Sequence, residues 1–149
     1  MTSCPENASA NASSIAGSIT WTEIPATDMS RVQKFYAEVF GWTYDGMAPI
    51  LDANGSPRFV MFNKGSTNGG FVKVEPEDFL SAALHPQNGE KRKLSVRNTI
   101  TVENVDESLK RVEEAGGEAY IPKVELPNKM GFVAYFTDSE KNVMGLWSM

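Results

Sequence analysis

Hydrophobic and polar positions change their spacing along the chain in an order that predicts strand, then helix, then strands. Residues 18–24 alternate between apolar and polar types, as on a strand with two different faces, and Pro25 is expected to end that strand. Over 29–40 the apolar residues recur every three or four positions, with Asp28 before them as a favourable N-cap and Gly41 after them as a helix stop. Three more β-prone stretches follow, at 42–44, 58–62 and 70–74.

The same order begins again near residue 98. A β-prone stretch at 98–102 precedes a helical stripe at 105–115, for which Asn104 is the expected N-cap. The remaining predicted strands lie at 118–124, 132–136 and 143–147. Two helix-stop glycines, Gly41 and Gly117, lie 76 positions apart, so the repeated order indicates an internal duplication.

The duplication predicts an α+β fold of two βαβββ modules. Each module would form a curved mixed sheet covered by a helix on one face, and the uncovered faces are expected to pair around a cavity. The first seventeen residues contain one charge, Glu6, and little apolar material, so they are predicted to be a disordered tail. We expect one domain over 18–149, with module one at 18–75, a linker at 76–96 and module two at 97–149.

Composition and charge narrow the classes of partner. Of 149 residues, 41% are hydrophobic, which is enough for a sizeable core. The net charge of −5, with no basic stripe, disfavours nucleic-acid binding, and the chain has no apolar run of the length that crosses a membrane. The single cysteine, Cys4, excludes a disulfide framework, and together these features predict a cytoplasmic protein.

Several short segments resemble one known group of proteins. They are Ile24-Pro25 leading to Asp28, Phe35-Tyr36, Phe40-Gly41-Trp42, Ala115-Gly116-Gly117, and Ala134 to Asp138 running on to Asn142 and Gly145-Leu146-Trp147. Their order and spacing resemble the vicinal oxygen chelate superfamily, which contains glyoxalases, bleomycin-resistance proteins and extradiol dioxygenases. The resemblance covers almost all of the chain after residue 18 and implies paired βαβββ modules.

The resemblance also implies where metal ligands would lie, on the first and last strand of each module. The residues at those positions are Trp21, Gly69 or Gly70, Arg97 or Asn98, and Gly145. A divalent transition ion needs several imidazole, thiolate or carboxylate donors, which this set does not supply, and the one histidine, His85, lies in the predicted linker. We therefore expect no metal and no other cofactor.

Strand alternation predicts which side chains face the cavity. If Thr22, Ile24 and Ala26 pack under the first helix, then Trp21, Glu23 and Pro25 face the cavity. In module two, Ile100 and Val102 would face the helix, leaving Arg97, Thr99 and Thr101 for the cavity, and Gly145 shares a face with Trp147.

Glu23 is the candidate catalytic residue. A carboxylate held against Trp21 and Trp147 would lose water and accept a proton more readily, which suits a general acid or base. The alternative is that Glu23 forms an ion pair with Arg97 or Lys73.

The other candidates would bind substrate. Lys73 and Arg97 could hold a carboxylate or phenolate. Trp21, Phe71, Tyr135 and Trp147 could stack on a flat ligand beside Thr99. The alternatives are solvent-facing cations and ordinary aromatic packing.

Three functions remain open at this point. The leading hypothesis is a metal-independent enzyme, an isomerase, cyclase or lyase, that transfers a proton on an apolar or aromatic small molecule. The second is a binding or resistance protein that sequesters a small molecule without chemistry, as the resemblance also allows. The third is a metal-dependent lyase with ligands elsewhere in the chain. In each case a homodimer is possible, because two modules can pair within one chain or between two chains.

Overall fold

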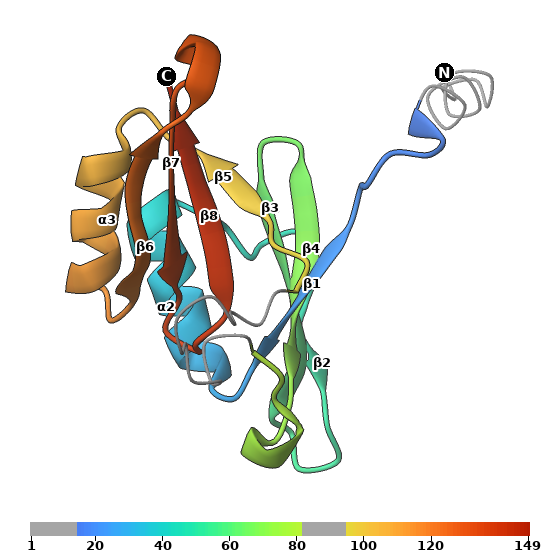
Figure 1. Cartoon of the computed structure of the whole chain (residues 1–149). Helices are drawn as coiled ribbons and strands as arrows, with labels where there is room; N and C mark the ends of the chain where they lie inside the picture. The colour runs from blue at the N-terminus through green and yellow to red at the C-terminus, as the bar shows by residue number, and fades with distance from the viewer. Residues whose placement is uncertain (1–14, 82–94) are drawn as a thin grey trace.

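The computed structural model describes residues 15–81 and 95–149, which form two four-stranded mixed sheets and two long helices (Figure 1). Sheet 1 has the order β1-β4-β3-β2 and belongs to module one; its elements are β1 (Thr22–Ala26), α2 (Met29–Phe40), β2 (Ile50–Leu51), β3 (Pro57–Lys64) and β4 (Thr67–Lys73). Sheet 2 has the order β5-β8-β7-β6 and belongs to module two; its elements are β5 (Thr99–Thr101), α3 (Val105–Glu114), β6 (Glu118–Glu125), β7 (Phe132–Thr137) and β8 (Val143–Ser148). Two short 3-10 turns, η1 (Pro76–Asp78) and η3 (Pro127–Lys129), complete the elements. The predicted α+β fold of two βαβββ modules is confirmed.

The predicted helix ends are confirmed by their capping bonds. The Asp28 side chain accepts a hydrogen bond from the Arg31 backbone N–H at 3.0 Å, and the Asn104 side chain accepts one from Glu107 at 3.0 Å. Gly41 ends α2 in the left-handed conformation, with φ of 70°. These bonds are local in sequence, which is why the pattern located both helices to within about one residue.

Two strand predictions were wrong in detail. The strand expected at 42–44 is a single bridge between Thr43 and Asn63, and the second strand of module one lies instead at Ile50–Leu51. Pro25 does not end β1 but lies within it. Because β1 pairs only with β4, it is an edge strand, and the missing N–H of Pro25 costs no ladder bond.

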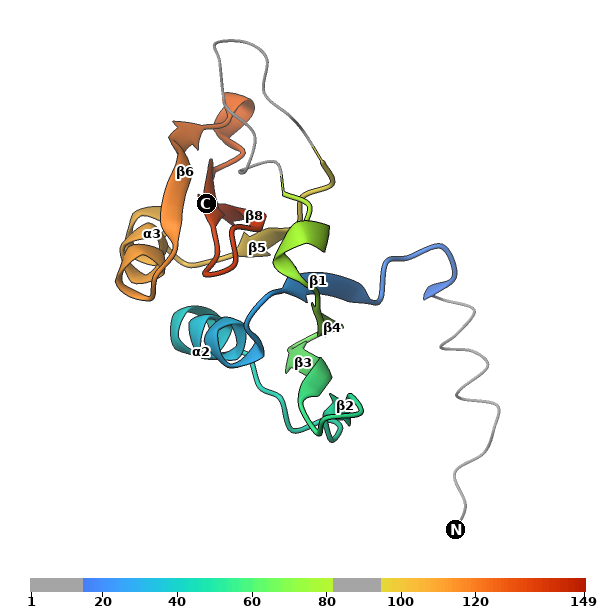
Figure 2. The ribbon, with the colours of Figure 1, turned by 90° about the horizontal axis from the view of Figure 1, so that it is seen from below.

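Both helices lie in the corner between the two sheets (Figure 2). The ring of Tyr36 on α2 is 5.4 Å from that of Phe71 on sheet 1, and the ring of Phe35 on the same helix is 6.1 Å from that of Phe136 on sheet 2. Buried side chains from both modules therefore form one continuous core. As predicted, Ile24 and Ala26 are buried and Ile100 and Val102 pack against this core.

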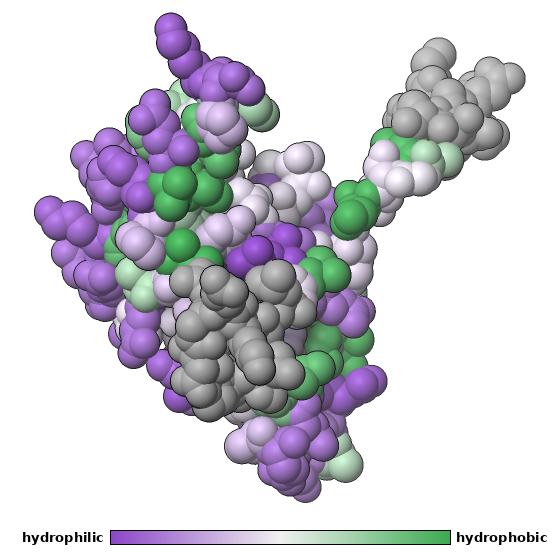
Figure 3. Space-filling model, in the orientation of Figure 1, coloured by the Kyte–Doolittle hydropathy of each residue, from purple (hydrophilic) through white to green (hydrophobic). Residues whose placement is uncertain are grey.

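The sheet faces opposite the helices are exposed. We call these the open face of sheet 1 and the open face of sheet 2. Hydrophobic side chains appear at the surface over both sheets among hydrophilic ones (Figure 3). Trp21 is 44% exposed on the first open face, and Thr99 is exposed on the second. The prediction that the two uncovered faces enclose a cavity within one chain is therefore wrong, because the helix-covered faces are the ones that pack together.

A polar turn fastens the modules to each other. The Glu140 side chain, in the turn between β7 and β8, accepts hydrogen bonds from the Thr27 backbone N–H at 3.0 Å and the Asp28 backbone N–H at 2.8 Å. Its carboxylate also forms an ion pair with Arg31 at 2.6 Å, and Asn142 donates to the Pro25 carbonyl at 2.9 Å. We call this set the module clamp, because it joins the end of module two to the start of α2.

Asp138 begins that turn and is 1% exposed. It accepts hydrogen bonds from the backbone N–H groups of Glu140 and Asn142 at 2.8 and 2.9 Å and from the Tyr36 hydroxyl at 2.8 Å. Burial raises the pKa of Asp138, and the hydrogen bonds from Asn142 and Tyr36 offset only part of that shift. Asp138 therefore holds the turn together and links it to the core through Tyr36.

The boundaries of the tail at 1–17 and the linker at 76–96 remain predictions, because residues 1–14 and 82–94 lie outside the described residues. No helix in the described ranges is long and apolar enough to cross a membrane.

Candidate functional site

The open face of sheet 1 is an apolar surface with one carboxylate. Strand register places Ile50, Phe59, Val72 and Pro25 in one row across the four strands, and Met61, Gly70 and Glu23 in the next. The Phe59 ring extends over Gly70, where an added Cβ would lie 2.1 Å from the ring. That space lets Phe59 stack against Trp21, with ring centroids 6.3 Å apart and an interplanar angle of 8°.

The open face of sheet 2 is more polar. Register places Thr99, Gly145 and Tyr135 in one row, and Thr101, Trp147 and Val133 in the next. The Arg97 guanidinium carbon lies 4.2 Å from the centroid of the Tyr135 ring, a cation–π contact. The Trp147 indole N–H donates to the Met130 carbonyl at 2.9 Å, which fixes the ring at the edge of this face.

The two open faces are built in the same way. Trp21 and Arg97 differ by the repeat offset of 76 positions, as do Glu23 and Thr99. In each sheet a glycine of the last strand, Gly70 or Gly145, pairs with the first strand and leaves room for an aromatic ring from the neighbouring strand. The modules thus present two equivalent half-sites, one apolar with an acid and one aromatic with a cation.

Four of the predicted site residues lie together on sheet 2: Arg97, Thr99, Tyr135 and Trp147. Trp21 and Glu23 lie together on sheet 1, and the single chain does not bring the two groups face to face (Figure 2). Lys73 is on neither open face. It is three residues from Gly70, so strand alternation turns its side chain the other way, and its ammonium group donates to the Thr27 carbonyl.

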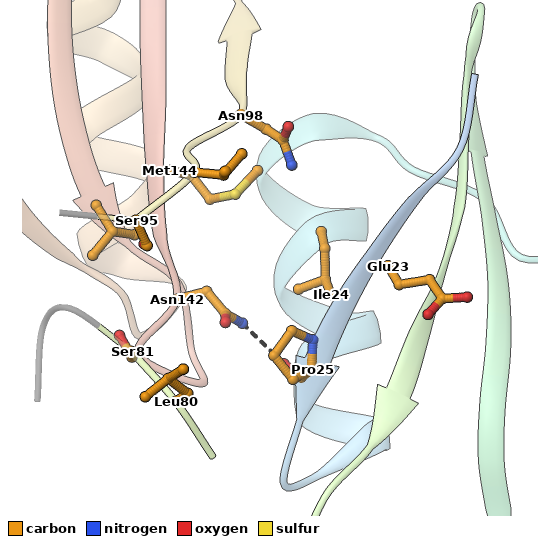
Figure 4. A pocket seen from close by; sticks show the side chains of 11 residues that line it. Glu23, Ile24, Pro25, Leu80, Ser81, Ser95, Asn98, Asn142 and Met144 are labelled. Atoms are coloured by element: carbon orange, nitrogen blue, oxygen red, sulfur yellow. Dashed lines mark hydrogen bonds between the residues drawn. The ribbon is translucent and has the colours of Figure 1, made fainter. Parts of the chain in front are cut away.

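Glu23 is exposed in the single chain, so its predicted removal from water is not found there. Its backbone borders a pocket of about 170 Å³ between β1 and β8, but its carboxylate points away from Asn98 and Met144 (Figure 4). Within the described part of the chain, Glu23 forms no ion pair with Arg97 or Lys73, so that alternative is not observed.

Comparison with known families agrees with this geometry. Residues 18–144 match the model of the Glyoxalase/Bleomycin resistance protein/Dioxygenase superfamily. The chain belongs to this superfamily. Among solved structures, a glyoxalase family protein from Enterococcus faecalis matches with a TM-score of 0.63 at 18% identity, covering 87% of this chain and 96% of that one. An antibiotic-binding protein from Streptomyces sp. CB03234 matches with a TM-score of 0.55 at 21% identity, covering 87% and 93%.

Two curated proteins match over most of this chain. The protein CFP32 of Mycobacterium bovis is 27% identical over 132 residues, which are 88% of this chain and 45% of that protein. The chain therefore spans about half the length of this relative. A glyoxylase-like domain-containing protein of Didymella fabae is 28% identical over 85% of this chain and 89% of its own length.

The residues of this superfamily member do not fit a metal ion at the expected positions. Trp21, Gly70, Arg97 and Gly145 offer no imidazole, thiolate or carboxylate. Across residues 15–81 and 95–149, no group of three or more His, Cys, Asp or Glu side chains is placed to hold a metal.

Sequence reasoning missed two residues that shape the site. Phe59 stacks on Trp21. The alternation of residues along its own strand does not predict which ring on another strand it contacts. Glu140 anchors the module clamp 109 positions away from Arg31, and the sequence near it gives no sign of that contact.

Proposed function

We propose that the protein is a metal-independent small-molecule enzyme whose cavity forms between two chains. In this arrangement the open face of sheet 1 of one chain covers the open face of sheet 2 of the other, and two-fold symmetry creates two identical cavities. Support comes from the half-sites: Glu23 with its apolar surroundings and Arg97 with its aromatic partner are halves of one predicted site that a single chain keeps apart. A sheet face bearing exposed Trp21 and Ile50 is also unusual unless it is covered.

Closure would change the chemistry of Glu23. Facing Tyr135 and Trp147 of a second chain, its carboxylate would lose water and become a stronger base. It could then take a proton from a carbon of the substrate and return the proton to another atom, while Arg97 stabilises the negative charge that develops between the two steps. An isomerase or lyase reaction of this kind needs no other reactant.

The prediction for Glu23 can be tested without knowing the substrate. We expect wild-type protein, incubated with a metabolite extract in deuterated water, to introduce deuterium into at least one metabolite or convert it, as measured by mass spectrometry. Glu23→Gln should abolish this change, because an amide cannot carry the proton. The matched control is Glu38→Gln, a glutamate on the exposed side of α2, which should behave as wild type. Equal labelling by the Glu23→Gln variant would rule out the mechanism.

A binding protein is the second candidate. The observation in its favour is that Glu23 is the one carboxylate in the rows of residues described above, and it is exposed in the single chain. The antibiotic-binding neighbour shows that the fold can serve this purpose. In the same experiment a binding protein would retain a small molecule through gel filtration and release it unlabelled and unchanged.

The two-chain cavity predicts a dimer that depends on the open face of sheet 1. Ile50 is 39% exposed beside Phe59, so Ile50→Asp should place a charge in the interface and raise the dimer dissociation constant by at least about a hundredfold. Sedimentation equilibrium measures this change. Leu80→Asp, at a site 82% exposed and outside both open faces, should leave the dimer intact. A wild-type chain that sediments as a monomer at high concentration would contradict the arrangement.

A further inference from the structure

Arg97 is a cation on the open face of sheet 2 that forms no ion pair with any described residue. Its guanidinium group lies over the Tyr135 ring, and the side chain is half-buried. In the part of the chain that the structure describes, it makes no hydrogen bond and no ion pair. A guanidinium group carries five N–H donors, so its hydrogen-bonding capacity is open to a ligand.

The surroundings of Arg97 are flat as well as cationic. Gly145 has no side chain, and the Thr99 hydroxyl and the Tyr135 ring fill the space above it, since an added Cβ would lie 2.5 Å from the first and 3.2 Å from the second. The Tyr135 ring forms one part of this surface, and Trp147, two residues from Gly145 on the same face, forms another. A planar molecule can lie against such a surface better than a bulky one.

The held guanidinium group adds directional selectivity. Stacking on Tyr135 limits the rotation of the Arg97 side chain, so fewer conformations are lost when a ligand binds. The free edge of the guanidinium plane can donate two parallel hydrogen bonds to a carboxylate, or one strong bond to a phenolate. A lysine at this position would supply charge without the planar fork.

We propose that this site takes a planar conjugated anion, an aromatic carboxylate or phenolate, with its charged group on Arg97 and its ring against the surface formed by Tyr135 and Trp147. The proposal rests on the small-molecule function proposed above and specifies its ligand class. The apolar half-site, with Trp21 stacked on Phe59, would cover the other end of the same molecule. An uncharged polycyclic ligand would leave the guanidinium group unpaired in a closed cavity, at a cost in affinity.

Three probes of similar size test the proposal by calorimetric titration: naphthoate, naphthamide and decahydronaphthoate. We expect wild-type protein to bind naphthoate about tenfold more tightly than the uncharged amide, and more tightly than the saturated anion. Arg97→Gln should remove the preference for the anion over the amide. Arg97→Lys should keep that preference but lose the preference for the flat anion over the saturated one. Arg111→Gln, an exposed arginine on α3, is the matched control and should bind as wild type.

Several results would overturn the proposal. They are undetectable naphthoate binding, equal affinity for naphthoate and naphthamide, or an anion preference that survives Arg97→Gln in a variant with an unchanged melting temperature. Sedimentation of the same samples shows whether the protein is a dimer. It therefore separates failure of the anion site from failure of the two-chain cavity. A monomer with an Arg97-dependent preference would refute the shared cavity alone, whereas a dimer that labels its substrate through Glu23 without that preference would refute the anion site alone.

Discussion

Replacing Gly69 by alanine is expected to lower the free energy of unfolding by about 3 kcal/mol or more. Gly69 pairs with Thr22 at the contact between β1 and β4. An added Cβ would lie 1.9 Å from the Thr22 carbonyl oxygen and 2.5 Å from the Phe62 ring, which is fully buried. The carbonyl oxygen cannot move without separating the two parallel strands, and the ring cannot move without disturbing the core. The whole first module should therefore lose stability.

The adjacent residue provides the matched control. At Gly70 the three atoms nearest to an added Cβ all belong to the Phe59 ring, which is half-buried on the open face and can swing towards solvent. Gly70→Ala also reduces the entropy of the unfolded chain, so its net effect should be under about 1 kcal/mol. Urea denaturation of both variants measures the difference. Equal losses for the two would show that the β1–β4 contact is not as close as the structure places it.

Local signals explain how much of the fold was predictable. Both helices were found because their caps, Asp28 and Asn104, bind backbone groups three residues away. Alternation along single strands likewise predicted that Glu23 and Arg97 share the side opposite the helices. Such features depend on neighbouring residues, so one sequence contains the information.

Long-range features were not predictable. The predicted packing of the modules is wrong because it assumes that α2 buries one stripe of side chains against one sheet. In fact Tyr36 packs against sheet 1 while Phe35 packs against sheet 2, so the helix is buried on two sides and the sheets meet around it. The half-site on one sheet therefore does not face the half-site on the other. Only the folded chain reveals this separation.

The module clamp has a consequence for the proposed cavity. It joins the turn after β7 to the first turn of α2, close to the end of β1. The clamp therefore fixes the angle between the two sheets. It does so close to β1, which carries Glu23, and close to the strand that follows Arg97. If a second chain must meet both open faces at once, that angle decides whether the two faces match.

Glu140→Ala is the second substitution with a large expected effect. The Glu140 side chain is fully buried and accepts bonds from two backbone N–H groups, two hydroxyl groups and Arg31. Removing it leaves the N–H groups of Thr27 and Asp28 without their acceptor at the start of α2. We expect a loss of about 3 kcal/mol in unfolding free energy, since several charge-assisted bonds are broken at once. Glu38→Gln, which breaks only the exposed pair with Lys34 at 3.9 Å, should change stability by under about 0.5 kcal/mol.

The clamp should also make stability depend on pH in a defined direction. Burial alone would raise the pKa of Glu140, but hydrogen bonds from Arg31, Asp28 and Ser139 outweigh it, so its pKa in the folded chain is lowered. A lowered folded pKa means that the contribution is complete above the unfolded pKa, about 4.3, and is lost as pH falls through the folded value. Glu140→Gln should therefore flatten the fall in wild-type stability below about pH 4, measured by urea denaturation across the acid range. A variant whose stability falls with acid as steeply as that of wild type would mean that Glu140 is not the ionised anchor of the clamp.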